Sequence, residues 1–244
     1  GSFFLPQVAI IHHFKENWGI RGGIGLGYKV PNALTPQMYD YPIENLLPIN
    51  LKTTKAEKSV GYNLEFNYKL NFGEIDSKEQ NSIFINQAFF LTEINNPITG
   101  NLDNSGNIEF KNEEKPIISK GFDTYIKAII DEWELYAGYT FTIAENKYLT
   151  KNQFIPLTPK NRFAMTALKE FKSWKAGIEA SFTGKQHRLD YTETPSYLFI
   201  AAMISKNVGE HFILVLNCEN LLDYRQSRKE PLYFGNISSP TFYP

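Results

Sequence analysis

The stretch "VGYNLEFNYKL", residues 60–70, decides the fold class of this chain. Every even position from Val60 to Leu70 carries an apolar or aromatic side chain, and every odd position from Gly61 to Lys69 carries a small, polar or charged one. An amphipathic helix would need apolar residues at positions i, i+3, i+4 and i+7, and the stretch does not match that template. Because successive side chains of a strand point to opposite sides, the alternation predicts a β-strand with one apolar face.

The same alternation recurs along the chain, and it predicts an all-β protein. It is clear in "WELYAGYTFT" (133–142) and "WKAGIEASFT" (174–183). Further strands are expected near residues 7–14, 80–92, 120–130, 161–171, 196–206 and 210–219, which makes about ten with the glycine-rich segment below.

The glycine-rich run "RGGIGLGYKVPN" (21–32) allows two interpretations. A phosphate-binding turn requires the glycines to open a helix, but Pro31 and the loop-like "NALTPQ" follow here. The run also alternates, with Ile24 and Leu26 on one face and glycines between Arg21 and Lys29 on the other. We therefore predict a strand whose nearly bare face leaves room beside it.

The expected connectors between these strands alternate in length. Short joints fall at 15–17, 73–80, 131–132, 169–173 and 206–210, and longer connectors fall at 30–58, 93–119, 144–160, 186–195 and after 221. An antiparallel up-and-down sheet with one tight end and one decorated end is typical of bacterial outer-membrane barrels. Expected strand lengths of about 9–12 residues match a tilted strand crossing a bilayer.

Composition excludes several classes of function. The net charge of −1 gives no electrostatic case for nucleic acid. The lone Cys218 rules out an intramolecular disulfide and a cysteine-based metal cluster, and the four histidines form no metal-binding array. No apolar run approaches the ~20 residues of a membrane-spanning helix. We expect no catalytic residues, no resident metal and no cofactor.

Two other classes of β-protein share the alternation. A soluble sandwich or lipocalin-like barrel that binds an apolar ligand would turn the apolar face inward, and a passive porin would turn it outward, as a receptor does. Two features favour a membrane barrel. The polar faces mix Gly, Asn, Thr and Ser with isolated Lys and Glu, as a wet lumen would. Aromatic residues gather at strand ends, as an interfacial girdle would: Trp18, Tyr28, Phe72, Trp133, Trp174 and Phe182.

Five segments together resemble the C-terminal half of the barrel of a TonB-dependent outer-membrane receptor, of the variety common in Bacteroidetes. They are "NWGIRGGIGLGYKVPNAL" (17–34), "NLKTTKAEKSVGYNLEFNYKL" (50–70), "KGFDTYIKAIIDEWELYAGYTFTIAEN" (120–146), "IPLTPKNRFAMTAL" (155–168) and "NCENLLDYRQSR" (217–228). The resemblance implies an antiparallel up-and-down transmembrane β-barrel of 22 strands. Residues 1–244 are expected to be a C-terminal part of that barrel domain, without the plug domain and the last strand.

The resemblance also implies function and location. The protein would be an active transport receptor in the outer membrane of a Gram-negative bacterium, not an enzyme. It would take up a scarce nutrient such as a ferric siderophore, haem, cobalamin or a similar chelate. Its implied partners are the TonB complex acting through the plug, the lipid bilayer with its lipopolysaccharide, the nutrient and a surface lipoprotein. Residues 31–60 contain no histidine where haem receptors of the family have one, which disfavours haem.

Two groups of side chains are candidate site residues. Ligand contacts are predicted in two outer loops, at Met38, Tyr39 and Tyr41 and at His187, Arg188 and Tyr191. Ordinary loop packing explains the same residues and stays open. Charged residues predicted to face the lumen would contact a plug or be solvated: Arg21, Lys29, Glu65, Lys69, Lys127, Glu134, Lys175 and Glu179.

Overall fold

A computed structural model of the chain describes residues 4–32, 45–73, 80–188, 191–225, 228–229, 233–236 and 239–242. Within these ranges the chain forms strands and their connections, and no α-helix is found. None of the described segments is a helix of the length and apolarity that spanning a membrane requires.

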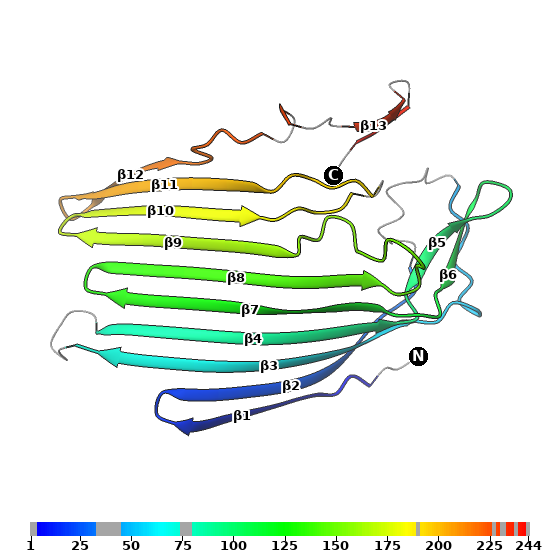
Figure 1. Ribbon diagram of the computed structural model, residues 1–244, viewed down its shortest axis with the longest axis horizontal. Helices are drawn as coiled ribbons and strands as arrows, with labels where there is room; N and C mark the ends of the chain where they lie inside the picture. Colours follow the sequence, from blue (N-terminus) through cyan, green and yellow to red (C-terminus); the bar gives the residue numbers. More distant parts are fainter. Residues whose placement is uncertain are drawn as a thin grey trace.

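Ten antiparallel strands form one large sheet, and each strand lies beside its neighbour in sequence except where β5 and β6 intervene (Figure 1). In order across the sheet the strands are β1 (Gln7–Lys15), β2 (Trp18–Lys29), β3 (Glu57–Phe72), β4 (Asn81–Asn95), β7 (Ile117–Ile130), β8 (Trp133–Asn146), β9 (Asn161–Phe171), β10 (Trp174–Thr183), β11 (Tyr197–Val208) and β12 (Phe212–Cys218). Two separate hairpins consist of β5 (Ile98–Leu102) with β6 (Ile108–Asn112) and of β13 (Tyr233–Asn236) with β14 (Ser239–Phe242). The predicted all-β, up-and-down antiparallel sheet is therefore confirmed.

The two ends of the sheet differ in the way that the connector lengths predict. Tight turns join the strands at one end, and the long connections with β5 and β6 lie at the other (Figure 1). The strands are longer than expected, since β3 has 16 residues and β4 has 15. Most of the extra residues continue the hydrogen-bonded ladder at the long-loop end, where Lys58 pairs with Asn95 and the pairing of β4 ends before Asn96, whose φ is 54°, and Pro97.

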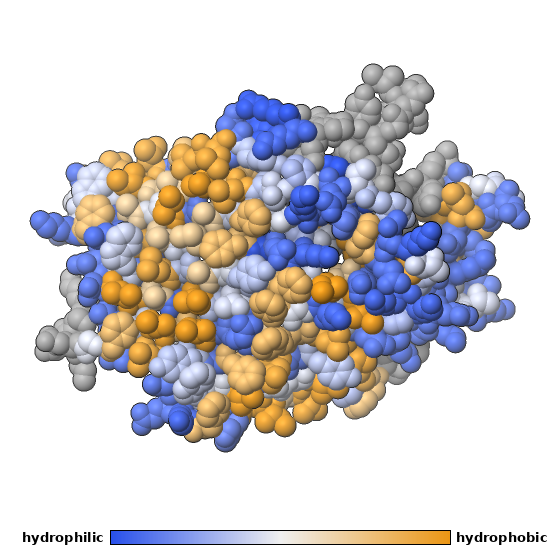
Figure 2. Space-filling view, in the orientation of Figure 1, coloured by the Kyte–Doolittle hydropathy of each residue, from blue (hydrophilic) through white to orange (hydrophobic). Residues whose placement is uncertain are grey.

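The pairing register gives the sheet one apolar face and one polar face. Ile24, Tyr62 and Leu91 are cross-strand neighbours, whereas Arg21 lies beside Glu65 on the opposite face. The apolar side chains stay accessible: Tyr62 is 48% exposed. Figure 2 shows hydrophobic side chains spread over the strands and hydrophilic ones gathered at the end with β5 and β6.

The described part of the sheet has no buried apolar interior. The only buried hydrophobic residues among those that the structure describes are Ile98, Ile108 and Phe110, and all three belong to the β5–β6 hairpin outside the ten-stranded sheet. A soluble sandwich would instead bury its alternating apolar residues against a second layer. The exposed apolar face is what a wall between hydrocarbon and water requires.

The glycine-rich run is part of strand β2, so the alternative of a phosphate-binding turn is wrong. A methyl group at Gly25 would lie 3.2 Å from Cγ of Gln7, and one at Gly27 would meet the hydroxyl of Ser59. The bare face therefore gives room to polar side chains of the two neighbouring strands.

Replacement of Gly121 by alanine is expected to destabilise the barrel by about 1–3 kcal/mol. The added methyl group would collide with the backbone carbonyl of Phe141 on β8 and with the ring of Phe90. Gly138 is the matched control, because its nearest neighbour would be 4.0 Å from the new methyl group. The stability of both variants is measured as the denaturant midpoint of unfolding in phospholipid vesicles. Equal midpoints for the Gly121 and Gly138 variants would contradict this packing.

The connector 93–119, expected to be a long loop, contains the β5–β6 hairpin. Its turn is held by Asp103, whose Oδ1 accepts hydrogen bonds from the backbone amides of Ser105 and Asn107, each 2.8 Å long. The amide of Asn107 is the main cause that lowers the pKa of the Asp103 carboxyl. A small apolar cluster joins this hairpin to the preceding loop, and we call it the loop cluster: Leu46, Ile49, Ile98, Ile108 and Phe110.

Candidate functional site

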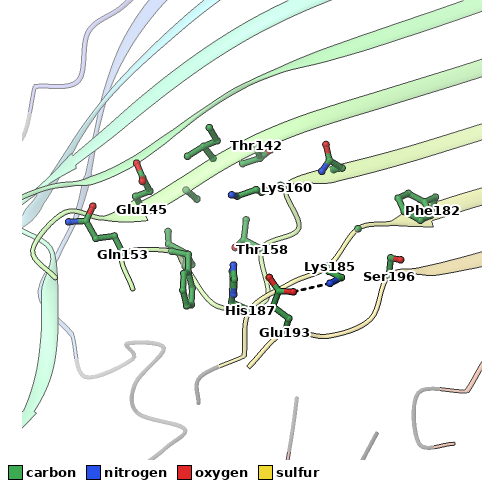
Figure 3. A pocket seen from close by; sticks show the side chains of 16 residues that line it. Thr142, Glu145, Gln153, Thr158, Lys160, Phe182, Lys185, His187, Glu193 and Ser196 are labelled. Carbon is green, nitrogen blue, oxygen red and sulfur yellow. Dashed lines mark hydrogen bonds and ion pairs between the residues drawn. The ribbon is translucent and has the colours of Figure 1, made fainter. Parts of the chain in front are cut away.

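A pocket of about 540 Å³ lies at the long-loop end, where strands β8 to β11 meet their connections. We call it the rim pocket, and Figure 3 shows its side chains. Those labelled there are Thr142, Glu145, Gln153, Thr158, Lys160, Phe182, Lys185, His187, Glu193 and Ser196.

Backbone hydrogen bonds between two connections build the pocket. The amide of Ile155 donates to the carbonyl of Ala144 (3.1 Å), so the connection after β8 folds back along that strand. The amide of Leu157 donates to the carbonyl of His187 (2.8 Å), which ties the same connection to the one after β10. Residues far apart in sequence are thereby held at one rim.

An aromatic stack forms one wall of the pocket. The rings of Phe154 and His187 are 3.8 Å apart between centroids and 19° from parallel. Tyr191 meets Phe154 edge-on at 5.8 Å. Nδ1 of His187 is buried and has no hydrogen-bond partner within the described residues. The structure thus brings the predicted residues His187 and Tyr191 together around Phe154, which sequence reasoning missed.

Arg188 takes a different position from its two predicted companions. Its side chain is buried in its own loop, where its guanidinium donates to the hydroxyl of Thr192 (2.8 Å) and to the carbonyl of Glu193 (3.2 Å). These bonds hold the short hairpin that presents His187. The other predicted cluster, Met38, Tyr39 and Tyr41, lies outside the described residues.

The charges of the pocket are mostly paired. Lys185 Nζ donates to Glu193 Oε2 at 3.1 Å, and this bond is the main reason that the pKa of Glu193 lies below its usual value. The charges of His187 and Lys160 act in the same direction. Glu145 pairs with Lys147 at 2.7 Å. Lys160 makes no ion pair within the described residues, and Lys147, the partner of Glu145, does not line the pocket. The two lysines and two glutamates of the lining therefore balance in charge, with Lys160 as the lysine without an ion pair.

The predicted lumen charges lie on the polar face of the sheet. Arg21 lies 3.8 Å from Glu65, and Lys29 lies 3.5 Å from Glu57 on the neighbouring strand. Glu134 accepts a hydrogen bond from the hydroxyl of Tyr136. By register Lys69, Lys127, Lys175 and Glu179 share this face, with cross-strand neighbours Phe84, Tyr136, Glu170 and Thr166 respectively. Such exposed pairs contribute little to stability, and contact of these residues with a plug remains a prediction.

Comparison with protein families identifies the fold. A family model described as "TonB dependent receptor-like, beta-barrel" matches residues 1–221. The chain belongs to this family of TonB-dependent receptors. Its members are transport receptors, not enzymes, and they reside in the outer membrane of Gram-negative bacteria. This chain is assigned to that membrane by its family.

Solved receptor structures share the fold of this chain. A ferric enterobactin receptor of Pseudomonas aeruginosa in complex with enterobactin has a TM-score of 0.72 and 15% identity over 91% of this chain and 35% of its own. The ferric yersiniabactin uptake receptor of Yersinia pestis has a TM-score of 0.68 and 16% identity, over 96% of this chain and 34% of its own. The ferripyoverdine receptor of Pseudomonas aeruginosa has a TM-score of 0.67 and 12% identity, over 90% of this chain and 29% of its own. The chain thus spans about a third of the length of these receptors.

Membership of the family orients this TonB-dependent receptor barrel in the membrane. Outer-membrane barrels have short periplasmic turns and longer extracellular loops. The tight turns of Figure 1 therefore lie at the periplasmic end, and the β5–β6 hairpin and the rim pocket lie at the extracellular end.

Proposed function

We propose that the chain forms part of the barrel of an active transport receptor that takes up a scarce nutrient chelate with TonB-coupled energy. A ferric siderophore is the favoured cargo, with haem, cobalamin or a similar chelate as alternatives. The family supports uptake across the outer membrane. Fold neighbours described as receptors for ferric enterobactin, ferric yersiniabactin and ferripyoverdine support the cargo class.

The observation that carries the cargo class is the chemistry of the rim pocket. The Phe154–His187 stack offers a flat aromatic wall, and Lys160 adds an unpaired cation. Apolar and aromatic surface with a few placed polar groups is the usual make-up of a ligand site. A lysine without an ion pair beside a flat aromatic wall favours an anionic ligand with planar groups, such as a ferric catecholate, because complementary charge offsets part of the cost of removing both from water.

Uptake by cells tests the proposal directly. The receptor, expressed from its complete gene, is placed in a Gram-negative strain that lacks its own siderophore receptors. Radiolabelled ferric enterobactin, haem and cobalamin are supplied separately. We expect accumulation of the ferric siderophore with TonB present and none after deletion of tonB. Equal accumulation without TonB, together with open conductance in planar bilayers, would show a passive porin instead.

Replacement of Lys160 by methionine is expected to weaken binding of an anionic ferric chelate by about 10- to 100-fold, because a hydrogen bond to a charged group contributes about 1.5–3 kcal/mol. Equilibrium binding to the purified receptor measures the change. Lys111→Met is the control, since this exposed lysine belongs to β6 at the same end and pairs only with Glu109 among described residues. A similar loss in both variants would show general electrostatics rather than a site.

A further inference from the structure

The periplasmic end of the barrel wall carries a band of aromatic and cationic side chains on its apolar face. We call it the cationic belt, and it consists of Trp133, Lys169, Phe171, Trp174 and Lys206. The register places them side by side: Lys169 is the cross-strand neighbour of Trp133, and Trp174 lies between Phe171 and Lys206. All five lie within three residues of a tight turn.

Each lysine of the belt rests on a tryptophan ring. Lys169 Nζ lies 5.0 Å from the ring centroid of Trp133, and Lys206 Nζ lies 4.7 Å from that of Trp174. Tryptophan at the end of a membrane-spanning segment sits at the level of the lipid headgroups. The two ammonium groups are therefore held at that same level by cation–π contact.

Neither lysine has a carboxylate partner within the described residues, as no ion pair joins either one to Asp or Glu there. The nearby strand carboxylates Glu134, Glu170 and Glu179 alternate to the opposite, lumen face. There Glu170 bonds Lys175 at 2.6 Å. Near these turns the strands therefore carry two lysines and no carboxylate on the apolar face, and Asp131, Glu132 and Glu210 lie in the turns themselves. Charges that face lipid need a counter-ion.

We propose that the cationic belt binds the phosphate of anionic phospholipid in the periplasmic leaflet. Strand spacing puts the Cα atoms of Lys169 and Lys206 about 12 Å apart, because two strand spacings and two residues separate them. Ala176, the small neighbour of Lys169 on β10, lies between them. Both long side chains therefore reach one headgroup or two adjacent ones, while the exposed rings of Trp133, Phe171 and Trp174 contact the upper acyl chains.

Native mass spectrometry of the receptor, expressed from its complete gene and released from detergent, tests this site with phosphatidylglycerol as probe. Each lysine near an anionic surface contributes about 1 kcal/mol, so Lys169→Gln with Lys206→Gln should weaken retention about 25-fold. The same lysines changed to arginine should keep retention, because the positive charge remains. Zwitterionic phosphatidylcholine should respond little to either pair.

Lys175→Gln is the matched control, since this lysine lies at the same level on the lumen face. Heat-modifiable migration on gels shows that each variant is folded, and the arginine pair covers the case in which the glutamine pair fails to fold. Unchanged phosphatidylglycerol retention by the glutamine pair, or lost retention by the arginine pair, would overturn the proposal. So would an equal loss with Lys175→Gln. Loss of lipopolysaccharide rather than phosphatidylglycerol would also overturn it, because that lipid belongs to the other leaflet.

Discussion

Replacement of Ile108 by alanine is expected to open the β5–β6 hairpin at a cost of about 2–5 kcal/mol while the barrel wall stays folded. Ile108 is 1% exposed and lies at the centre of the loop cluster. Its truncation leaves a cavity among Ile98, Phe110 and the preceding loop. The cluster has too few other side chains to close this cavity by repacking. Few other apolar contacts hold the hairpin, so the loss is concentrated there.

Amide hydrogen exchange of the receptor in detergent measures this prediction segment by segment. Exchange should accelerate in 98–112, while β7 and β8 keep their protection. Leu102→Ala is the control within the same hairpin, because Leu102 is 58% exposed and its removal leaves no cavity. Faster exchange throughout the ten strands after Ile108→Ala would show that the hairpin and the wall unfold together.

Replacement of Ile178 by arginine is expected to lower the stability of the barrel in a bilayer by about 2–4 kcal/mol. Ile178 lies midway along β10 on the apolar face, between Ala167 and Ala202, and is 49% exposed. A guanidinium there would replace an aliphatic contact with acyl chains by a charge in hydrocarbon. Equilibrium unfolding from phospholipid vesicles, followed by tryptophan fluorescence, gives the free energy.

The matched control for this charge is Thr166→Arg. Thr166 lies at nearly the same height on β9 but on the polar face, opposite Glu179. An arginine there meets water and a carboxylate, so we expect a change near zero. The reverse order of stabilities would mean that the polar face meets lipid, and it would invalidate the assignment of the two faces.

Much of the wall could be predicted because its signal is local. Strands β9 and β10 match the expected segments 161–171 and 174–183, since period-2 alternation and turn residues mark each strand within its own sequence. The β5–β6 hairpin was not predicted, because each of its strands has only five residues and its apolar partner Leu46 comes from an earlier loop. The turn signal "DNSG" (103–106) between the two strands was the clue that could have found it.

The candidate site was predictable only in part. His187 and Tyr191 were predicted as ligand contacts because they lie in a long connection, but nothing in the local sequence marks Phe154 as their partner. The stack depends on the hydrogen bond from Leu157 to His187, which joins two connections separated by a complete hairpin of the wall.

By itself, the sequence determined the approximate number of strands in the wall and which side chains share a face, because in an extended chain the parity of a residue decides its side. Tertiary structure alone decided the rim pocket, the loop cluster and the pairing of each lysine of the cationic belt with its tryptophan. These contacts join residues on different strands or loops, and only the register and the folding back of the connections bring them within reach.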